Sequence, residues 1–173
     1  NMLYSAMLSA ISELYNLPEL SVKAEKIRET VYYQSFDGKF FRDHAVRENG
    51  ILKTKSDSTE VCQYYAFFFG IATPERNGEL FEILLHKFGP ERNRDTDYPE
   101  IAPANAFIGN YLRLEILMRA GFKEDALKNI VGFFGYMADR TGTLWENIDT
   151  GASCNHCFAS YVICWLEKLK NII

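Results

Sequence analysis

A run of apolar patterns with helical spacing, separated by short connections, is the feature of this sequence that most restricts its fold. Over 2–15 the apolar residues recur three and four positions apart, and Asn16-Leu17-Pro18 then ends the pattern. Proline is accepted in the first turn of a helix, so a second helix is expected to begin at Pro18. The pattern predicts an all-α chain of about seven helices in series, which span 2–15, 18–33, 59–72, 75–88, 104–120, 123–138 and 152–169.

The region between the second and third predicted helices has a different pattern. Asp37-Gly38 lies between aromatic residues, and Asn49-Gly50 separates Val46 from Ile51. Both dipeptides are favoured in the two-residue turns that join antiparallel strands. A small β-hairpin excursion is therefore expected within the helical chain.

The helices that follow are of two kinds. Those that begin near Ser58, Ala104 and Ala152 are rich in aromatic and small residues, whereas those that begin near Glu75 and Lys123 are amphipathic. A double ring of helices would produce this alternation, because inner helices are covered on all sides and outer helices keep one wet face. A globin-like or solenoid arrangement is the structural alternative, although no fixed repeat period supports a short-repeat solenoid.

Composition restricts the partners of the chain. Its 173 residues fit one domain, and a hydrophobic share of 47% supplies a large core. The net charge of −4 argues against nucleic acid or an anionic membrane as the main partner. No apolar run approaches the roughly 20 residues that cross a bilayer, and the first residues lack the basic start of a signal peptide. The compartment stays undecided between bacterial cytoplasm and periplasm.

Cysteine spacing gives no support for a metal or a cofactor. Cys154 and Cys157 form a C-x-x-C pair, but a zinc site needs about four ligands and the chain has no second pair. Cys157 and Cys164 fall within a helical apolar pattern, where thiols pack as small hydrophobes. We therefore expect neither a metal nor a cofactor.

The strongest functional signal is the loop that contains Trp145-Glu146. It is followed by Ser153-Cys154-Asn155-His156, at the start of an apolar helix. A carboxylate beside an aromatic face suits sugar chemistry, because the sugar ring packs on the hydrocarbon while the acid acts on a proton. In the alternative interpretation Trp145 is a core anchor and Glu146 is a solvated surface acid.

Three segments together resemble bacterial α-L-rhamnosidases of the six-hairpin glycosidase class. Ser58-Thr59-Glu60 through Gly70-Ile71 is similar to the inner helix of that family that ends in a Phe-Gly-Leu type turn, and 101–122 resembles its next inner helix. Thr143-Leu144-Trp145-Glu146 with Ser153-Cys154-Asn155-His156 resembles the Trp-Glu loop and the Ser-x-Asn-His helix start, which is the most specific match.

The resemblance implies an (α/α)6 barrel and an inverting hydrolysis of terminal α-L-rhamnose or a related sugar. In this family the Glu of the Trp-Glu loop is the general base, which corresponds to Glu146. The His of the Asn-His pair contacts the sugar, which corresponds to His156 and makes Asn155 a candidate beside it. Trp145 would form an apolar wall of the pocket, and the partner is a carbohydrate.

The chain also departs from the family pattern. The general acid of the family lies in an upstream motif that has no counterpart here, and about seven helices cannot close a ring of six helix pairs. We therefore interpret residues 1–173 as a single domain that forms the C-terminal part of the barrel, with an N-terminal remainder as its partner.

Further candidates lie on the predicted inner helices. Glu60 and Tyr64 are one helical turn apart and could share a face that binds sugar hydroxyls, or Glu60 could be a buried acid paired with Arg or Lys. Asn105 could bind a hydroxyl or cap its helix. Asp43-His44 is interpreted as a surface feature, because adjacent strand residues point to opposite faces.

Two alternatives to the hydrolase remain open. One is a catalytically inactive carbohydrate-binding or interaction fragment of a helical barrel. The other is a sugar epimerase of similar architecture.

Overall fold

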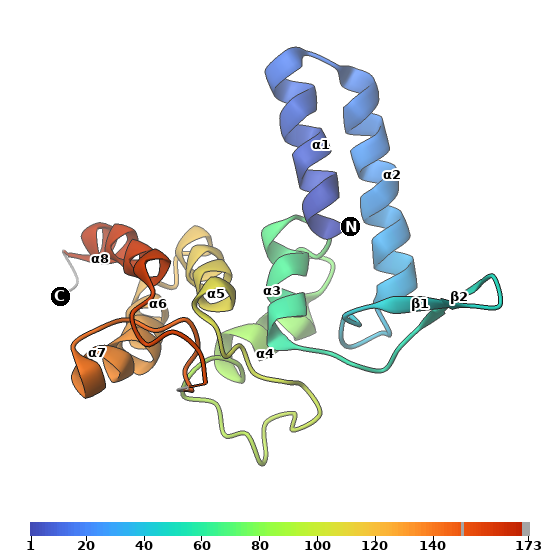
Figure 1. The fold of residues 1–173 in the computed structure, drawn as a ribbon. Coiled ribbons are helices and arrows are strands. Elements are labelled where there is room, and N and C mark those ends of the chain that lie inside the picture. Colours follow the sequence, from blue (N-terminus) through green and yellow to red (C-terminus); the bar gives the residue numbers. More distant parts are fainter. Residues whose placement is uncertain (150, 171–173) are drawn as a thin grey trace. The chain divides into compact units, whose positions relative to one another are not determined.

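The computed structural model describes residues 1–149 and 151–170, and most of them are helical. The chain divides into two compact units, an N-terminal unit over Asn1–Ile83 and a C-terminal unit over Leu84–Ile173. Counted as continuous segments, the described residues contain seven helices and one two-stranded hairpin, as the sequence predicts (Figure 1). That the chain forms one domain stays a prediction.

The N-terminal unit begins with a helical hairpin. Helices α1 (Met2–Tyr15) and α2 (Pro18–Ser35) run side by side (Figure 1). Asn16 takes the left-handed conformation at φ 54° and its N–H donates to the Ser12 carbonyl, which ends α1. Pro18 then begins α2, so both helix starts follow the prediction.

Both predicted turns of the β excursion are present. Strands β1 (Ala45–Glu48) and β2 (Ile51–Thr54) pair antiparallel, with Asn49 and Gly50 at positive φ in the two-residue turn between them. At the first turn, Phe36 bridges to Phe41, and the Asp37 carboxylate accepts the backbone N–H groups inside the turn.

Helices α3 (Glu60–Phe68) and α4 (Gly78–His86) are shorter than the sequence predicts. The N-cap of α3 is Thr59, one residue after Ser58. The Thr59 hydroxyl accepts the Cys62 N–H at 3.0 Å, whereas the Ser58 hydroxyl donates to the Phe41 carbonyl. Past Phe68 the chain turns at Gly70, which has φ +71° and ends the helix well before residue 72.

The C-terminal unit packs helices around an apolar core. Its elements are α5 (Phe107–Arg119), α6 (Lys123–Ile130), the π-helical turn η1 (Val131–Gly135), α7 (Tyr136–Thr141), the 3-10 helix η2 (Cys157–Val162) and α8 (Ile163–Leu169). Its fully buried side chains include Leu114, Leu117, Phe133, Phe134, Met137, Trp145 and Leu169. The described part of the chain holds no helix whose length and apolar character would let it span a bilayer.

Two helices of this unit differ from the predicted ones. The helix expected over 123–138 contains the π turn and continues to Thr141. The helix expected from residue 152 begins only at Cys157, and its first turns are 3-10. The Tyr111 hydroxyl binds backbone groups of these turns, and residues 153–156 stay irregular and bond to the backbone of residues 144–146.

Candidate functional site

The segment that carries Glu146 is irregular, and residues 153–156 hold it on one side. The Glu146 N–H donates to the Ser153 carbonyl at 2.9 Å, and the His156 N–H donates to the Leu144 carbonyl at 2.8 Å. These bonds tie the two segments to each other. They fix Glu146 and His156 at the same end of the C-terminal unit.

The other side of the segment is bound to the start of α5. The Phe107 N–H donates to the Glu146 carbonyl at 3.1 Å, and the Ile148 N–H donates to the Asn105 carbonyl at 2.7 Å. The backbone at Glu146 is therefore anchored by main-chain bonds to two segments that are distant in sequence. Such anchoring limits the motion of the loop although it is irregular.

Trp145 lies in the core beneath this segment. Its side chain is 1% exposed, its indole N–H donates to the Thr141 hydroxyl at 2.7 Å, and its ring meets Tyr136 edge to face. The Thr141 hydroxyl is 2.7 Å from that of Thr143, which donates to the Cys154 carbonyl. The structure thus gives Trp145 an anchoring position, and direct contact of its ring with a sugar stays a prediction.

Glu146 and His156 form a partly exposed acid-imidazole pair. Glu146 Oε2 lies 3.9 Å from His156 Nδ1, and the two side chains are 45% and 25% exposed. Water can reach this carboxylate, and a ring nitrogen that can donate a hydrogen bond lies next to it. The arrangement permits proton transfer to and from a bound water or hydroxyl group.

The imidazole is in contact with two phenyl rings that the sequence analysis did not select. The His156 ring centroid lies 5.0 Å from that of Phe107 and 5.8 Å from that of Phe158. Each Phe follows a predicted site residue by two positions, Asn105 in one case and His156 in the other. That spacing is the only sequence signal that could have identified them.

Both phenyl rings belong to an open aromatic groove between α5 and the start of the last helix. The groove has a volume of about 560 Å³, and its walls are Phe107, Ile108, Tyr111, Cys157, Phe158, Ser160, Tyr161 and Ile163. Phe158 is 70% and Tyr161 is 59% exposed. Exposed apolar surface of this kind commonly marks a place where another molecule binds.

Asn105 and Asn155 are both exposed at this end of the unit. Asn105 is not the helix cap that the alternative interpretation suggests, because α5 is preceded by Ala106 and has no side-chain cap bond. Asn155 precedes His156, and its N–H donates to the Ser153 hydroxyl at 3.4 Å. Five of the seven predicted site residues therefore lie on three backbone segments that are bonded to one another. These residues are Asn105, Trp145, Glu146, Asn155 and His156.

Glu60 and Tyr64 belong to the N-terminal unit and are buried. They are 1% and 0% exposed, and the Tyr64 hydroxyl donates to Glu60 Oε2 at 2.9 Å. A contact of either with a sugar stays a prediction. Asp43 and His44 of the same unit are exposed, as predicted, and the Asp43 carboxylate accepts both the N–H and the hydroxyl of Thr59.

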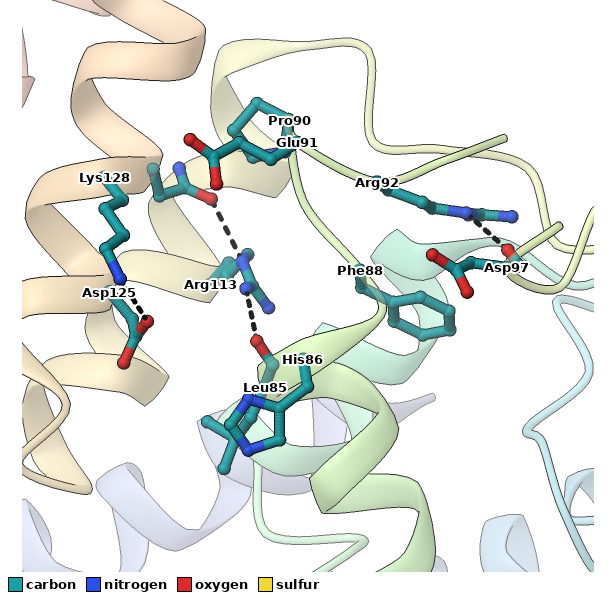
Figure 2. Close-up of a pocket in the computed structure, with 11 residues that line it drawn as sticks. Leu85, His86, Phe88, Pro90, Glu91, Arg92, Asp97, Arg113, Asp125 and Lys128 are labelled. Atoms are coloured by element: carbon teal, nitrogen blue, oxygen red, sulfur yellow. Dashed lines mark hydrogen bonds and ion pairs between the residues drawn. The ribbon is translucent and has the colours of Figure 1, made fainter. Parts of the chain in front are cut away.

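A second cavity of the C-terminal unit is lined by charged groups (Figure 2). It has a volume of about 240 Å³. The buried Arg113 donates to the Asn129 side chain at 3.0 Å and to the carbonyls of Leu84 and Leu85 at the end of α4. Lys128 lies 3.7 Å from Asp125 in the same view. Arg113 thus joins α5 to α6 and to the end of α4, so we assign the cavity a structural role.

Cysteines and metal-binding groups give no further site. Cys157 is exposed, so its prediction as a packed residue is wrong, and it projects from the 3-10 turn rather than from a regular helix. Cys154 and Cys164 are half-buried free thiols. Over 1–149 and 151–170, groups of three or more His, Cys, Asp or Glu side chains that could hold a metal ion are not found.

Two titratable groups of α5 have shifted pKa values. Burial raises the pKa of Tyr111 to about 12, so its hydroxyl stays neutral at physiological pH. Partial burial raises the pKa of Glu115, but hydrogen bonds from Trp165 and Arg119 and the charges of Arg119 and Lys168 outweigh it. The net pKa is lowered.

Comparisons with known protein families, with curated proteins and with solved structures give no match for this chain.

Proposed function

We propose that this chain carries the water-activating part of an inverting glycoside hydrolase of α-L-rhamnosidase type. The observation that supports it is the accessible Glu146 carboxylate, held by backbone bonds on both sides and 3.9 Å from the His156 imidazole. In the proposed reaction Glu146 is the general base. It takes a proton from the water that attacks the anomeric carbon, and the bond to the leaving oxygen breaks on the opposite face.

His156 has a different part in this proposal. Its ring nitrogen, 3.9 Å from the Glu146 carboxylate, would donate a hydrogen bond to a sugar hydroxyl bound beside that acid. The Phe107 and Phe158 rings restrict the orientation of the imidazole, and Asn105 and Asn155 offer exposed amide groups nearby. A fixed donor beside a fixed carboxylate is the kind of preorganisation that lowers a reaction barrier.

An inverting hydrolase also needs a general acid, roughly 6.5–9.5 Å from the base. The sequence offers no counterpart of the acid motif of the rhamnosidases, so we propose that the acid is supplied by a portion of the enzyme outside these residues. By the same reasoning the helices described here would be the C-terminal part of an (α/α)6 barrel. The exposed aromatic groove supports this proposal, because neighbouring helices of a larger barrel would cover such a surface.

The test uses a substrate whose departure needs no acid. A dinitrophenyl α-L-rhamnoside has a leaving group that is stable as an anion, so base catalysis by Glu146 alone should release it. We expect release of dinitrophenolate with the β-anomer of rhamnose as the first product, detected by absorbance and by NMR of the sugar. Absence of release above the buffer rate, or the α-anomer as first product, would contradict the proposal.

The alternative function is a non-catalytic interaction module. The observation that favours it is the same groove, whose walls have no charged side chain. In that case L-rhamnose or a rhamnose oligomer would bind without hydrolysis. The sugar epimerase has no specific observation of this kind in its favour, and sugar analysis after incubation with free rhamnose would detect it.

A further inference from the structure

Tyr111 belongs to α5, and its side chain contacts the last helical segment. Its side chain is 8% exposed, and its ring stacks on Phe134 and lies 4.9 Å from that of Trp165. The ring is therefore held by rigid neighbours on two other helical segments. A side chain packed in this way restricts where the groups that are hydrogen-bonded to it can lie.

The hydroxyl of Tyr111 binds the backbone that follows His156. It lies 2.8 Å from the Phe158 carbonyl and 2.6 Å from the Ala159 carbonyl, and it accepts the Val162 N–H at 3.1 Å. The Ala159 N–H in turn donates to the carbonyl of His156 at 3.0 Å. One hydroxyl thus sets the 3-10 geometry of η2 and, through Ala159, the backbone at His156.

A second route joins the same two residues through aromatic contacts. The Tyr111 ring meets the Phe107 ring at 5.4 Å and 70°, and the Phe107 ring meets the His156 imidazole at 5.0 Å. The two routes reach His156 from its backbone and from its ring. Together they restrict both where the imidazole is and how it is turned.

We propose that Tyr111 is the positioning residue for His156 and, through it, for the acid-imidazole pair with Glu146. The structural part of this inference stands on its own, and its catalytic part rests on the proposed function. Tyr111 does not touch the reacting atoms in this proposal. It acts only through the place that it gives to the imidazole.

The first experiment reads the position of His156 without any substrate. The imidazole lies beside two phenyl rings, so its carbon-bound protons carry ring-current shifts that report its place. In Tyr111→Phe we expect these NMR signals to move toward the values of a free histidine. In Tyr33→Phe, which removes a hydroxyl from an exposed tyrosine of the N-terminal unit, they should stay unchanged. Unmoved His156 signals in a folded Tyr111→Phe protein would overturn the inference.

The second experiment separates positioning from general destabilisation. We expect Tyr111→Phe to lower kcat for the dinitrophenyl rhamnoside by roughly 10- to 100-fold with little change in KM, the scale of a misplaced group. In a His156→Ala background the same change should have no further effect, because its route of action is gone. An equal loss of kcat in both backgrounds would show that Tyr111 is only structural.

Two results keep these experiments decisive. If the wild-type protein releases no dinitrophenolate, the proposed function fails while the NMR comparison still decides the role of Tyr111. If Tyr111→Phe does not fold, both measurements are made on Tyr111→p-aminophenylalanine. Its amine keeps donors for the two carbonyls but is a poor acceptor, so the bond from the Val162 N–H is lost. We therefore expect smaller changes of the same sign, and their absence would overturn the inference.

Discussion

Two carboxylates of this chain, each with a hydrogen-bonding side chain beside it, are held in opposite ways. Glu60 in the N-terminal unit is 1% exposed and accepts the Tyr64 hydroxyl at 2.9 Å. The Glu146 side chain in the C-terminal unit is 45% exposed, and its imidazole partner lies 3.9 Å away. The first acid is integrated into the fold, whereas the second is presented to water by a backbone that is itself tightly bound.

The difference separates two uses of a carboxylate. A buried polar group costs free energy unless it is hydrogen-bonded, so Glu60 is tied to the stability of α3. A carboxylate that water reaches contributes little to stability and is available for chemistry. Removal of each acid should therefore change a different measurable property.

The largest effect is expected for Glu146→Gln. The amide cannot take a proton from water, so release of dinitrophenolate from the rhamnoside should fall by about 10³-fold, within the usual range for a lost general base. The free energy of unfolding should change by less than about 0.5 kcal/mol, because the side chain is half exposed. Glu124→Gln, at an exposed acid of α6, is the control and should keep full turnover. Unchanged turnover in Glu146→Gln would remove the functional half of the comparison.

Glu60→Ala should have the largest effect on stability. It removes buried atoms and leaves the Tyr64 hydroxyl without this acceptor, so the free energy of unfolding should fall by about 2–4 kcal/mol. Urea unfolding followed by circular dichroism measures the change. If Glu60→Ala lowered the free energy of unfolding no more than Glu146→Ala does, the buried acid would not stabilise the core.

Tyr64→Phe should cost less, because it removes only the hydroxyl. The Glu60 carboxylate loses the bond at 2.9 Å, and we expect a decrease of about 1–2 kcal/mol in the free energy of unfolding. The exposed Tyr15→Phe in α1 is the matched control and should be neutral. Equal stability of the two variants in urea would mean that the Glu60–Tyr64 bond contributes nothing net.

The smallest effect on stability is expected for Glu115→Gln. The Glu115 carboxylate is held in a way that is intermediate between those of Glu60 and Glu146. It accepts the Trp165 indole N–H at 3.2 Å and the Arg119 Nε at 3.0 Å, and its pKa is lowered in the folded protein. A lowered folded-state pKa stabilises the protein above the unfolded-state value near 4.5, and this contribution is lost as pH falls through the folded-state value. The stability advantage over Glu115→Gln should be below about 1 kcal/mol at pH 7. It should vanish on acidification in Trp-monitored urea unfolding, and a pH-independent difference would contradict this assignment.

The periodicity of the sequence predicted most of the helices because their apolar faces determine them. The start of α2 at Pro18 and the turn at Asn49-Gly50 follow from local chemistry, and both are confirmed. The first turns of the last helix were mispredicted because the Tyr111 hydroxyl, 47 to 51 residues away in sequence, binds their backbone groups. Long-range contacts of that kind leave no periodic signal.

The candidate site shows the same limit. The sequence selected Glu146 and His156 by their motif, and the structure brings these two side chains together. It did not select Phe107 or Phe158, because an aromatic residue at a helix start reads as core. For Glu60 the sequence left a sugar-binding role and a buried acid open, and the structure shows the acid buried beside Tyr64.

The π turn η1 has a consequence for how this region tolerates insertions and deletions. A π turn holds one residue more than the α-helical turn that it replaces, so it acts as a stored insertion between α6 and α7. Deletion of one residue within Val131–Gly135 would therefore leave a regular helix, in which the residues after Gly135 keep their orientation. The Thr141 hydroxyl would stay against the Trp145 indole, so the support beneath Glu146 would survive the loss of that residue.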